Sequence, residues 1–183
     1  KRKINLRTKR NIKKSNHTYS NQNSCFAKLA PEYYYRFRED GSFSNGSGCG
    51  NEIATENSMV RKFIIDSVKY WAQEYHIDGF RFDLMALHDR KTMELIAKRL
   101  HQIDSSIIVY GGPWMADSST LAASQQMIKG KQQRLGIAVF NDDFRDIIKG
   151  SPRGVDKGYA TGEINNIQKL KEGVVGAVNT FAA

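Results

Sequence analysis

The sequence predicts an α/β fold built on a parallel sheet, because helical and strand patterns alternate along its central part. Apolar residues recur at three- and four-residue steps in two long segments, and a short apolar run follows each segment. Helix, strand, helix, strand, helix, strand is the order of a parallel sheet with helical crossovers. An open doubly wound sheet and a (β/α)8 barrel both fit this order, and periodicity does not choose between them.

The first regular element is an amphipathic helix that begins at Asn57 or Ser58. Its apolar positions are Val60, Phe63, Ile64, Val68, Trp71 and Tyr75. A short strand over residues 77–83 follows. A second helix is then marked by Met93, Ile96, Leu100 and Ile103.

A second strand is predicted over residues 107–110, where it runs into Gly111-Gly112-Pro113. A third helix is expected near residues 121–130 and a third strand over residues 136–140. The rest of the chain is predicted to be helical in part. Residues 16–52 are predicted to form a long polar loop dotted with aromatic side chains, and loops of that length are usually functional.

The charge of the chain is concentrated at its start. The formal net charge is +9, yet eight of the 28 basic residues lie among the first 20 residues, which contain no acid, and the remainder is nearly neutral. Residues 1–15 are therefore predicted to form a basic, disordered arm, and residues 16–183 the globular part. No aromatic residue is interleaved in the arm before Tyr19, so a nucleic-acid partner is not expected.

Other features of the sequence give mainly negative expectations. No apolar run approaches the ~18 residues of a membrane span, and no signal-peptide pattern assigns a compartment. Cys25 and Cys49 have no metal-ligand spacing and are expected to be free thiols. His88 and His101 are expected on exposed surfaces, without metal-ligand partners.

The stretch from His76 to Asp83 carries the candidate chemistry. Side chains alternate between the faces of a strand, so Phe80 and Phe82 are predicted to pack on helices while Arg81 and Asp83 share the opposite face, roughly 7 Å apart. A carboxylate at the carboxyl end of a parallel strand, kept ionised by a neighbouring arginine, can serve as a nucleophile in a retaining glycosidase. A structural salt bridge at the strand end is the alternative.

Residues 78–85, Asp-Gly-Phe-Arg-Phe-Asp-Leu-Met, resemble the fourth-strand motif of glycoside hydrolase family 13, the α-amylase family, and most closely its type I pullulanases. The resemblance extends over residues 16–162. The other segments that carry it are Asn16 to Tyr19, Tyr33 to Arg36, Asn45 to Glu52, Tyr110 to Trp114 and Ala138 to Asp142. The resemblance implies a partial (β/α)8 TIM barrel, roughly strands 3 to 6 with their helices.

The same resemblance implies a role for each matching residue. Asp83 matches the catalytic nucleophile, and Arg81 the arginine that orients it. His17 matches a histidine that hydrogen-bonds the sugar, and Asn16 an asparagine that supports the site. Trp114, beside the fifth-strand motif, is a candidate platform for stacking of a sugar, and the alternative is a core residue. The implied partner is an α-glucan such as pullulan or branched dextrin, cleaved at α-1,6 links. No cofactor is expected, although some members of the family bind calcium.

The sequence departs from the family at the residue that supplies the proton. Gly112 stands where the family has the general acid/base glutamate, and Ile12 where its third-strand motif has an aspartate. Retaining hydrolysis needs two carboxyl groups about 5–5.5 Å apart. The seventh-strand motif is also missing, so an inactive fragment is predicted. The alternatives are a non-catalytic α-glucan-binding remnant and an α-1,4-cleaving relative.

Overall fold

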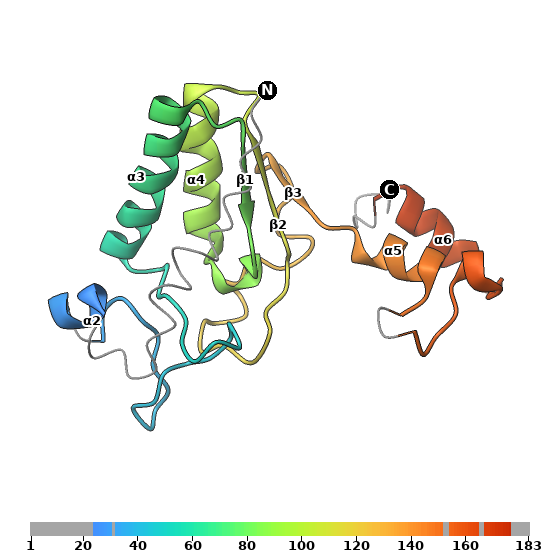
Figure 1. Ribbon diagram of the computed structural model, residues 1–183, viewed down its shortest axis with the longest axis horizontal. Coiled ribbons are helices and arrows are strands. Elements are labelled where there is room, and N and C mark those ends of the chain that lie inside the picture. The colour runs from blue at the N-terminus through green and yellow to red at the C-terminus, as the bar shows by residue number, and fades with distance from the viewer. Residues whose placement is uncertain (1–23, 31, 152–153, 165–166, 177–183) are drawn as a thin grey trace. The chain divides into compact units, whose positions relative to one another are not determined.

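The computed structural model describes residues 24–30, 32–151, 154–164 and 167–176, and the chain forms two compact units that meet in sequence after Val139. The first unit contains a three-stranded sheet of β1 (Gly79–Phe82), β2 (Ile108–Gly111) and β3 (Ile137–Val139). The strands are parallel and lie in the order β1-β2-β3 (Figure 1). The predicted α/β class and its parallel sheet are therefore confirmed.

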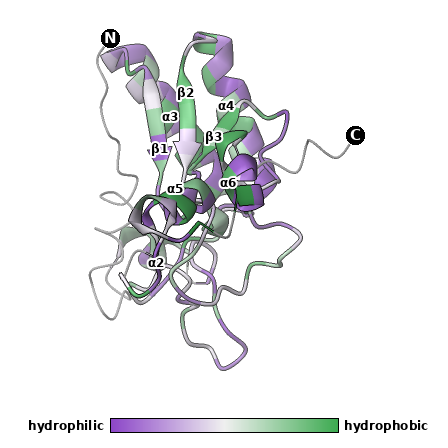
Figure 2. Ribbon diagram, turned by 90° about the vertical axis from the view of Figure 1, so that its right-hand side faces the viewer, coloured by the Kyte–Doolittle hydropathy of each residue, from purple (hydrophilic) through white to green (hydrophobic). Residues whose placement is uncertain are grey.

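Two helices pack beside this sheet. α3 (Ser58–Tyr75) follows the capping position Asn57, and α4 (Arg90–Ile103) begins after Asp89, whose side chain accepts a hydrogen bond from the Thr92 amide at 3.0 Å. Figure 1 shows the helices side by side next to β1. In Figure 2, β3 is largely hydrophobic, and of its three residues Ile137 is buried while Ala138 is exposed.

The core of the first unit joins the buried faces of these elements. Its largest fully buried side chains include Phe80, Phe82, Ile77, Met85, Met93, Ile96, Leu100, Val60 and Val109. Two predicted core positions of α3 differ from the structure, because Phe63 and Tyr75 are about half exposed while Ala72 is buried. The elements that pack against a helix decide which of its residues are buried. The buried face of α3 therefore includes Ala72 and leaves Phe63 and Tyr75 partly exposed.

The helix expected near residues 121–130 is wrong. Leu121 and Met127 are buried, but two backbone hydrogen bonds of this segment join it to residues at and just before the start of α4. Arg90 donates to the carbonyl of Gln125 at 2.8 Å, and Met127 donates to that of His88 at 3.2 Å. Since those groups are used between segments, they do not form a helical ladder.

The long loop expected over residues 16–52 is more ordered than predicted where the structure describes it. A short helix, α2 (Cys25–Leu29), begins after Ser24, whose hydroxyl accepts a hydrogen bond from the Ala27 amide at 3.0 Å. Farther along, residues 35 and 53 form an isolated antiparallel bridge, as do residues 37 and 43. This segment therefore folds back on itself.

The second unit contains α5 (Asp142–Lys149), the short helix η3 (Tyr159–Thr161) and α6 (Ile167–Val174). Asn141 caps α5 by accepting from the Phe144 amide at 3.1 Å, and its side-chain amide donates to the Gly173 carbonyl in α6 at 2.8 Å. Asp142 lies in the first turn, where a carboxylate complements the positive end of the helix dipole. Among the described residues, no helix has the length and apolar character that crossing a membrane requires.

Candidate active site

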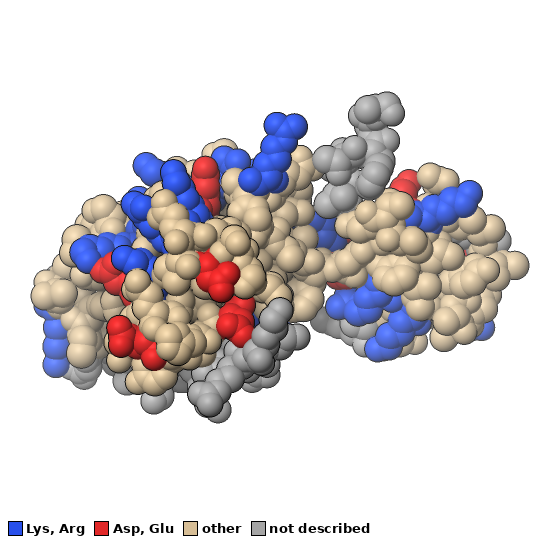
Figure 3. Space-filling model, turned by 90° about the horizontal axis from the view of Figure 1, so that it is seen from above, with Lys and Arg blue, Asp and Glu red and all other residues tan. Residues whose placement is uncertain are grey.

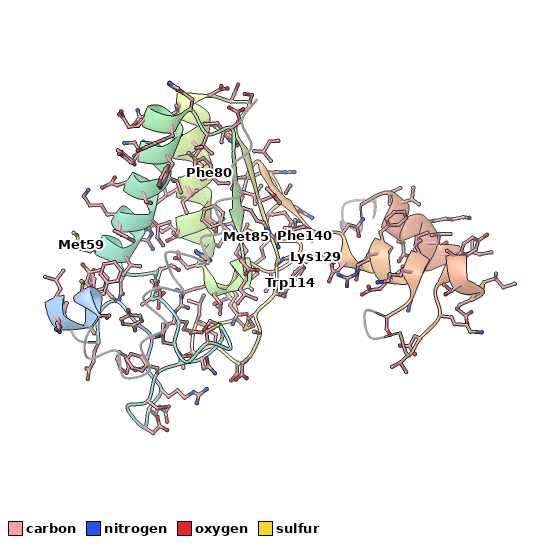
Figure 4. All side chains as sticks on the ribbon, viewed as in Figure 1. Met59, Phe80, Met85, Trp114, Lys129 and Phe140 are labelled. Carbon is pink, nitrogen blue, oxygen red and sulfur yellow. The ribbon has the colours of Figure 1, made fainter. Side chains whose placement is uncertain are left out.

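β1 separates apolar and charged side chains onto its two faces. Phe80 and Phe82 are buried, whereas Gly79 and Arg81, which alternate with them, are half-buried. Figure 4 shows Phe80 on the side of the helices. Asp83 is the first residue after the strand and is half-buried as well. The structure thus places Arg81 and Asp83 at the carboxyl end of β1, away from the apolar core.

Gly112 is held directly beside Asp83 by backbone hydrogen bonds. Its amide donates to the Phe82 carbonyl at 3.2 Å, and its carbonyl accepts from the Met85 amide at 2.7 Å. Neighbouring parallel strands lie about 4.8 Å apart, so these bonds make residues 83 and 112 lateral neighbours at the carboxyl ends of β1 and β2. Residue 112 is a glycine and has no side chain to place beside the Asp83 carboxylate.

The turn after Asp83 has an unusual backbone conformation. Leu84 has a φ of 52° and lies in the left-handed region, which costs a non-glycine residue about 1–2 kcal/mol. This turn leads into the short helix η2 (Met85–Leu87) and brings the Met85 amide to the Gly112 carbonyl. Uncommon backbone conformations of this kind concentrate at functional sites.

A buried ionic network holds the loops next to these strand ends. The Arg36 guanidinium bonds to the Glu52 carboxylate at 3.3 Å, to Glu56 at 2.8 Å and to the Leu87 carbonyl at 3.0 Å. Glu52 also accepts from the Ser119 hydroxyl at 2.6 Å. Arg36 and Glu52 are both buried, so the network links residues 36–56 to the segments that follow β1 and β2.

Sequence reasoning missed this network as a source of order. The signal that could have found it is the position of the two charges. Arg36 ends the aromatic run Tyr33-Tyr34-Tyr35, and Glu52 precedes the apolar pair Ile53-Ala54. A charged residue inside an apolar stretch is usually paired when it is buried.

The expectation that His88 is exposed is wrong, because its side chain is buried against Phe82, with ring centroids 5.5 Å apart. Burial lowers the pKa of His88 to about 4, and the positive charge of Arg36 acts in the same direction. The negative charge of Asp89 and the Leu84 backbone oppose this shift. Neither ring nitrogen has a hydrogen-bond partner of good geometry among the described residues, and the imidazole is therefore neutral at pH 7.

His101 also differs from its expected exposed position. It is half-buried near the end of α4, and its Nε2 lies 3.0 Å from the Ile107 carbonyl. This contact joins α4 to the start of β2 and assigns His101 a structural role. Cys25 and Cys49 are free thiols, as predicted.

The sugar-contacting residues implied by the resemblance divide into two groups. Trp114 lies three residues beyond β2, is 36% exposed and packs its indole over Gly112. Asn16 and His17 lie outside the described residues, so their predicted roles stay predictions. The structure therefore brings together Arg81, Asp83, Gly112 and Trp114 at one end of the sheet.

Two other features of the described residues lie apart from these strand ends. Across residues 24–176, leaving out the gaps in the description, no cluster of three or more His, Cys, Asp or Glu side chains could hold a metal ion. A surface groove of about 570 Å³ lies between α3 and α4 and includes Arg61, Lys62, Lys69 and Arg99. Figure 3 shows basic side chains on this unit, interspersed with carboxylates, and the groove contains no residue of the candidate site.

The similar proteins and the similar solved structures described below are all pullulanases. No family model matches the chain. A pullulanase of Bacillus subtilis (strain 168) is 37% identical over 163 residues, which are 88% of this chain and 23% of that protein. The solved pullulanase of Bacillus acidopullulyticus is 49% identical, with a TM-score of 0.80 over 83% of this chain and 19% of that one.

A second solved structure, the pullulanase of Paenibacillus barengoltzii in complex with maltohexaose and α-cyclodextrin, is 41% identical with a TM-score of 0.81. It is matched over 89% of this chain and 25% of its own length. The chain thus spans about a quarter or less of the relatives that it matches.

Proposed function

Because the chain is homologous to a segment of the pullulanases, we propose that it has the architecture of an α-glucan debranching hydrolase with an incomplete pair of catalytic carboxyl groups. The observation that carries the proposal is the backbone pairing of Gly112 with the residues on either side of Asp83. β1, β2 and β3 then correspond to three successive strands of a (β/α)8 barrel of glycoside hydrolase family 13.

Asp83 is assigned as the nucleophile of retaining hydrolysis. Its carboxylate oxygen attacks the anomeric carbon of the sugar, and the bond from that carbon to the glycosidic oxygen breaks. Arg81, two residues earlier on the same face of β1, orients the carboxylate. A glycosyl-enzyme ester and a departing sugar are the products of this step.

The departing sugar oxygen needs a proton, and Gly112 has none to give. General acid–base catalysis is typically worth about 10²–10⁴-fold in rate, which corresponds to roughly 3–5 kcal/mol of barrier. Cleavage of pullulan, whose leaving group is a poor one, should therefore be slow in this chain. A substrate that leaves without a proton should be affected far less.

The proposed ligand class is α-1,4- and α-1,6-linked glucan. The solved relatives support it, since their complexes contain maltotriose, maltohexaose or α-cyclodextrin. Trp114 offers an aromatic surface next to Gly112, and Asn16 and His17 are the other proposed sugar contacts. The resemblance of residues 45–52 to the pullulanases favours α-1,6 over α-1,4 cleavage.

A second candidate function is binding of α-glucan without hydrolysis. Gly112 favours it, because loss of the acid removes turnover and leaves the rest of the site in place. The two functions differ in what Asp83 does. In the first it forms a covalent bond to the sugar, and in the second it does not.

The test is covalent labelling with an α-glucosyl fluoride, whose fluoride leaves without a proton. Intact-protein mass spectrometry should detect one glycosyl adduct, and peptide mapping should place it on Asp83. The matched control is Asp83→Asn, which keeps the size of the side chain but removes the attacking charge. Folded chain that binds maltotriose and forms no adduct would favour the binding function over the proposed hydrolase chemistry.

A further inference from the structure

The indole of Trp114 lies where a side chain on residue 112 would begin. A Cβ atom at position 112 would be 2.7 Å from both Cε2 and Cζ2 of Trp114, and 3.2 Å from Cη2. Contacts under 3.0 Å are far inside van der Waals distance, so the indole and a 112 side chain exclude each other. Figure 4 shows Trp114 at the carboxyl end of the sheet, near Met85.

The Trp114 indole, and not the backbone conformation of residue 112, limits which side chains fit at residue 112. The φ of Gly112 does not lie in the left-handed range, so an L-residue could adopt its backbone conformation. Gly111 differs, because a Cβ there would lie 2.3 Å from the Phe82 carbonyl oxygen within the sheet. Gly111 is thus fixed by the backbone, whereas Gly112 is compatible with any side chain that can displace an indole.

We infer that Trp114 fills the space that an acid side chain on residue 112 would occupy and thereby excludes small anions from that space. A small anion such as azide has no room in the space beside Gly112, because aromatic carbons already occupy it. Trp114 is consequently the residue that controls access at this position.

Trp114 is 36% exposed, so displacement of its indole would carry it toward solvent. A methyl group at residue 112 is enough to require that movement. Gly112→Ala should therefore move the indole outward, and Trp114→Ala should open the space without adding an acid. Both effects are independent of whether Asp83 reacts with sugar.

The direct test follows the environment of Trp114 by ¹⁹F NMR of chain labelled with 5-fluorotryptophan. The chain has two tryptophans, Trp71 and Trp114, so two resonances are expected, and Trp71→Phe assigns them. Gly112→Ala should shift the Trp114 resonance toward its solvent-exposed position and increase its response to a soluble quencher. The Trp71 resonance should stay in place and report that the fold is intact.

Gly79→Ala is the matched control. A Cβ at residue 79 would make only ordinary contacts with Ile108, at 3.4 and 3.6 Å, and residue 79 is at the opposite end of β1 from Asp83. This variant should leave both resonances unchanged. A Trp114 resonance that does not move in Gly112→Ala, with Trp71 unchanged, would overturn the inference.

A chemical arm of the test rests on the proposed function. Azide can attack the anomeric carbon of the glycosyl-enzyme, break its bond to the Asp83 oxygen and release glycosyl azide and a free carboxylate, with no proton required. Starting from α-glucosyl fluoride, the unaltered chain should form no glycosyl azide and Trp114→Ala should form it. Azide product from the unaltered chain would overturn the exclusion of azide by Trp114, whereas absence of any Asp83 adduct in both would refute the hydrolase chemistry and leave the NMR result standing.

Discussion

Acidification should destabilise the fold through His88. The buried imidazole has a pKa of about 4, compared with 6.5 for an unperturbed histidine. Each tenfold change in proton affinity is worth about 1.4 kcal/mol, so His88 alone should lower the free energy of unfolding by about 3 kcal/mol. The folded state binds fewer protons than the unfolded state, so stability is full above pH 6.5 and is lost as the pH falls toward 4.

Two charged groups act on His88 from the elements packed around it. Arg36, from the loop before α3, disfavours the imidazolium, while Asp89, the capping residue of α4, favours it. Acid also acts on the fold through groups other than His88. The contribution of His88 is therefore the difference between the unaltered chain and a variant that lacks the imidazole.

The assay is urea unfolding followed by circular dichroism at a series of pH values from 7 to 4. His88→Leu is the variant, because neither imidazole nitrogen makes a well-formed hydrogen bond that would be lost. It should be close to neutral at pH 7 and less sensitive to acid by about 3 kcal/mol at pH 4. Equal pH dependence in the two proteins would refute the reasoning.

Three further substitutions test the scaffold. Arg36→Met leaves the buried Glu52 carboxylate without its cation and should cost about 3–5 kcal/mol, measured as the free energy of urea unfolding; a loss under about 1 kcal/mol would show that the pair is dispensable. Asp89→Ala removes the α4 cap and should cost about 1 kcal/mol in the same assay, and no loss would count against the cap. Gly111→Ala forces a Cβ to 2.3 Å from the Phe82 carbonyl oxygen and should lower the melting temperature much more than Gly79→Ala does. An equal or smaller loss in Gly111→Ala would contradict this prediction.

The regular elements could be predicted because their patterns are local. Apolar residues spaced at three and four positions gave α3 and α4, and short runs of β-branched and aromatic residues gave all three described strands. The alternation within residues 79–83 also predicts that Phe80 and Phe82 lie on the opposite face from Arg81, as the burial pattern of β1 shows. These features depend on neighbours in sequence, which the sequence displays directly.

The features that failed depend on contacts between distant segments. Residues 121–130 have apolar spacing close to that of a helix, but their backbone groups bond to Arg90 and His88 instead. His88 itself is polar by type and buried by its surroundings. The Arg36–Glu52 pair joins residues 16 positions apart, and its bonds to Leu87 and Ser119 join segments farther still. Local pattern contains no information on such contacts.

The candidate site was predictable in part for the same reason. Asp83 and Gly112 each stand at the end of a strand, and strands that are parallel and adjacent bring their carboxyl ends together. The position of the Trp114 indole was not predictable, because it depends on the space that a missing side chain leaves. The roles assigned to Arg81, Asp83 and Trp114 remain predictions.

The most direct test of an incomplete carboxyl pair is the dependence of cleavage rate on the leaving group. A series of aryl α-maltotriosides with increasingly acidic phenols should be cleaved by the unaltered chain with a steep rise in rate, because no group protonates the departing oxygen. Gly112→Glu, which moves the indole and supplies the acid, should flatten that rise and raise the rate of the poorest leaving groups by about 10²–10⁴-fold. The claim would be contradicted if the rate in the unaltered chain did not depend on the leaving group and Asp83→Asn abolished cleavage. That result would show that another group already donates the proton.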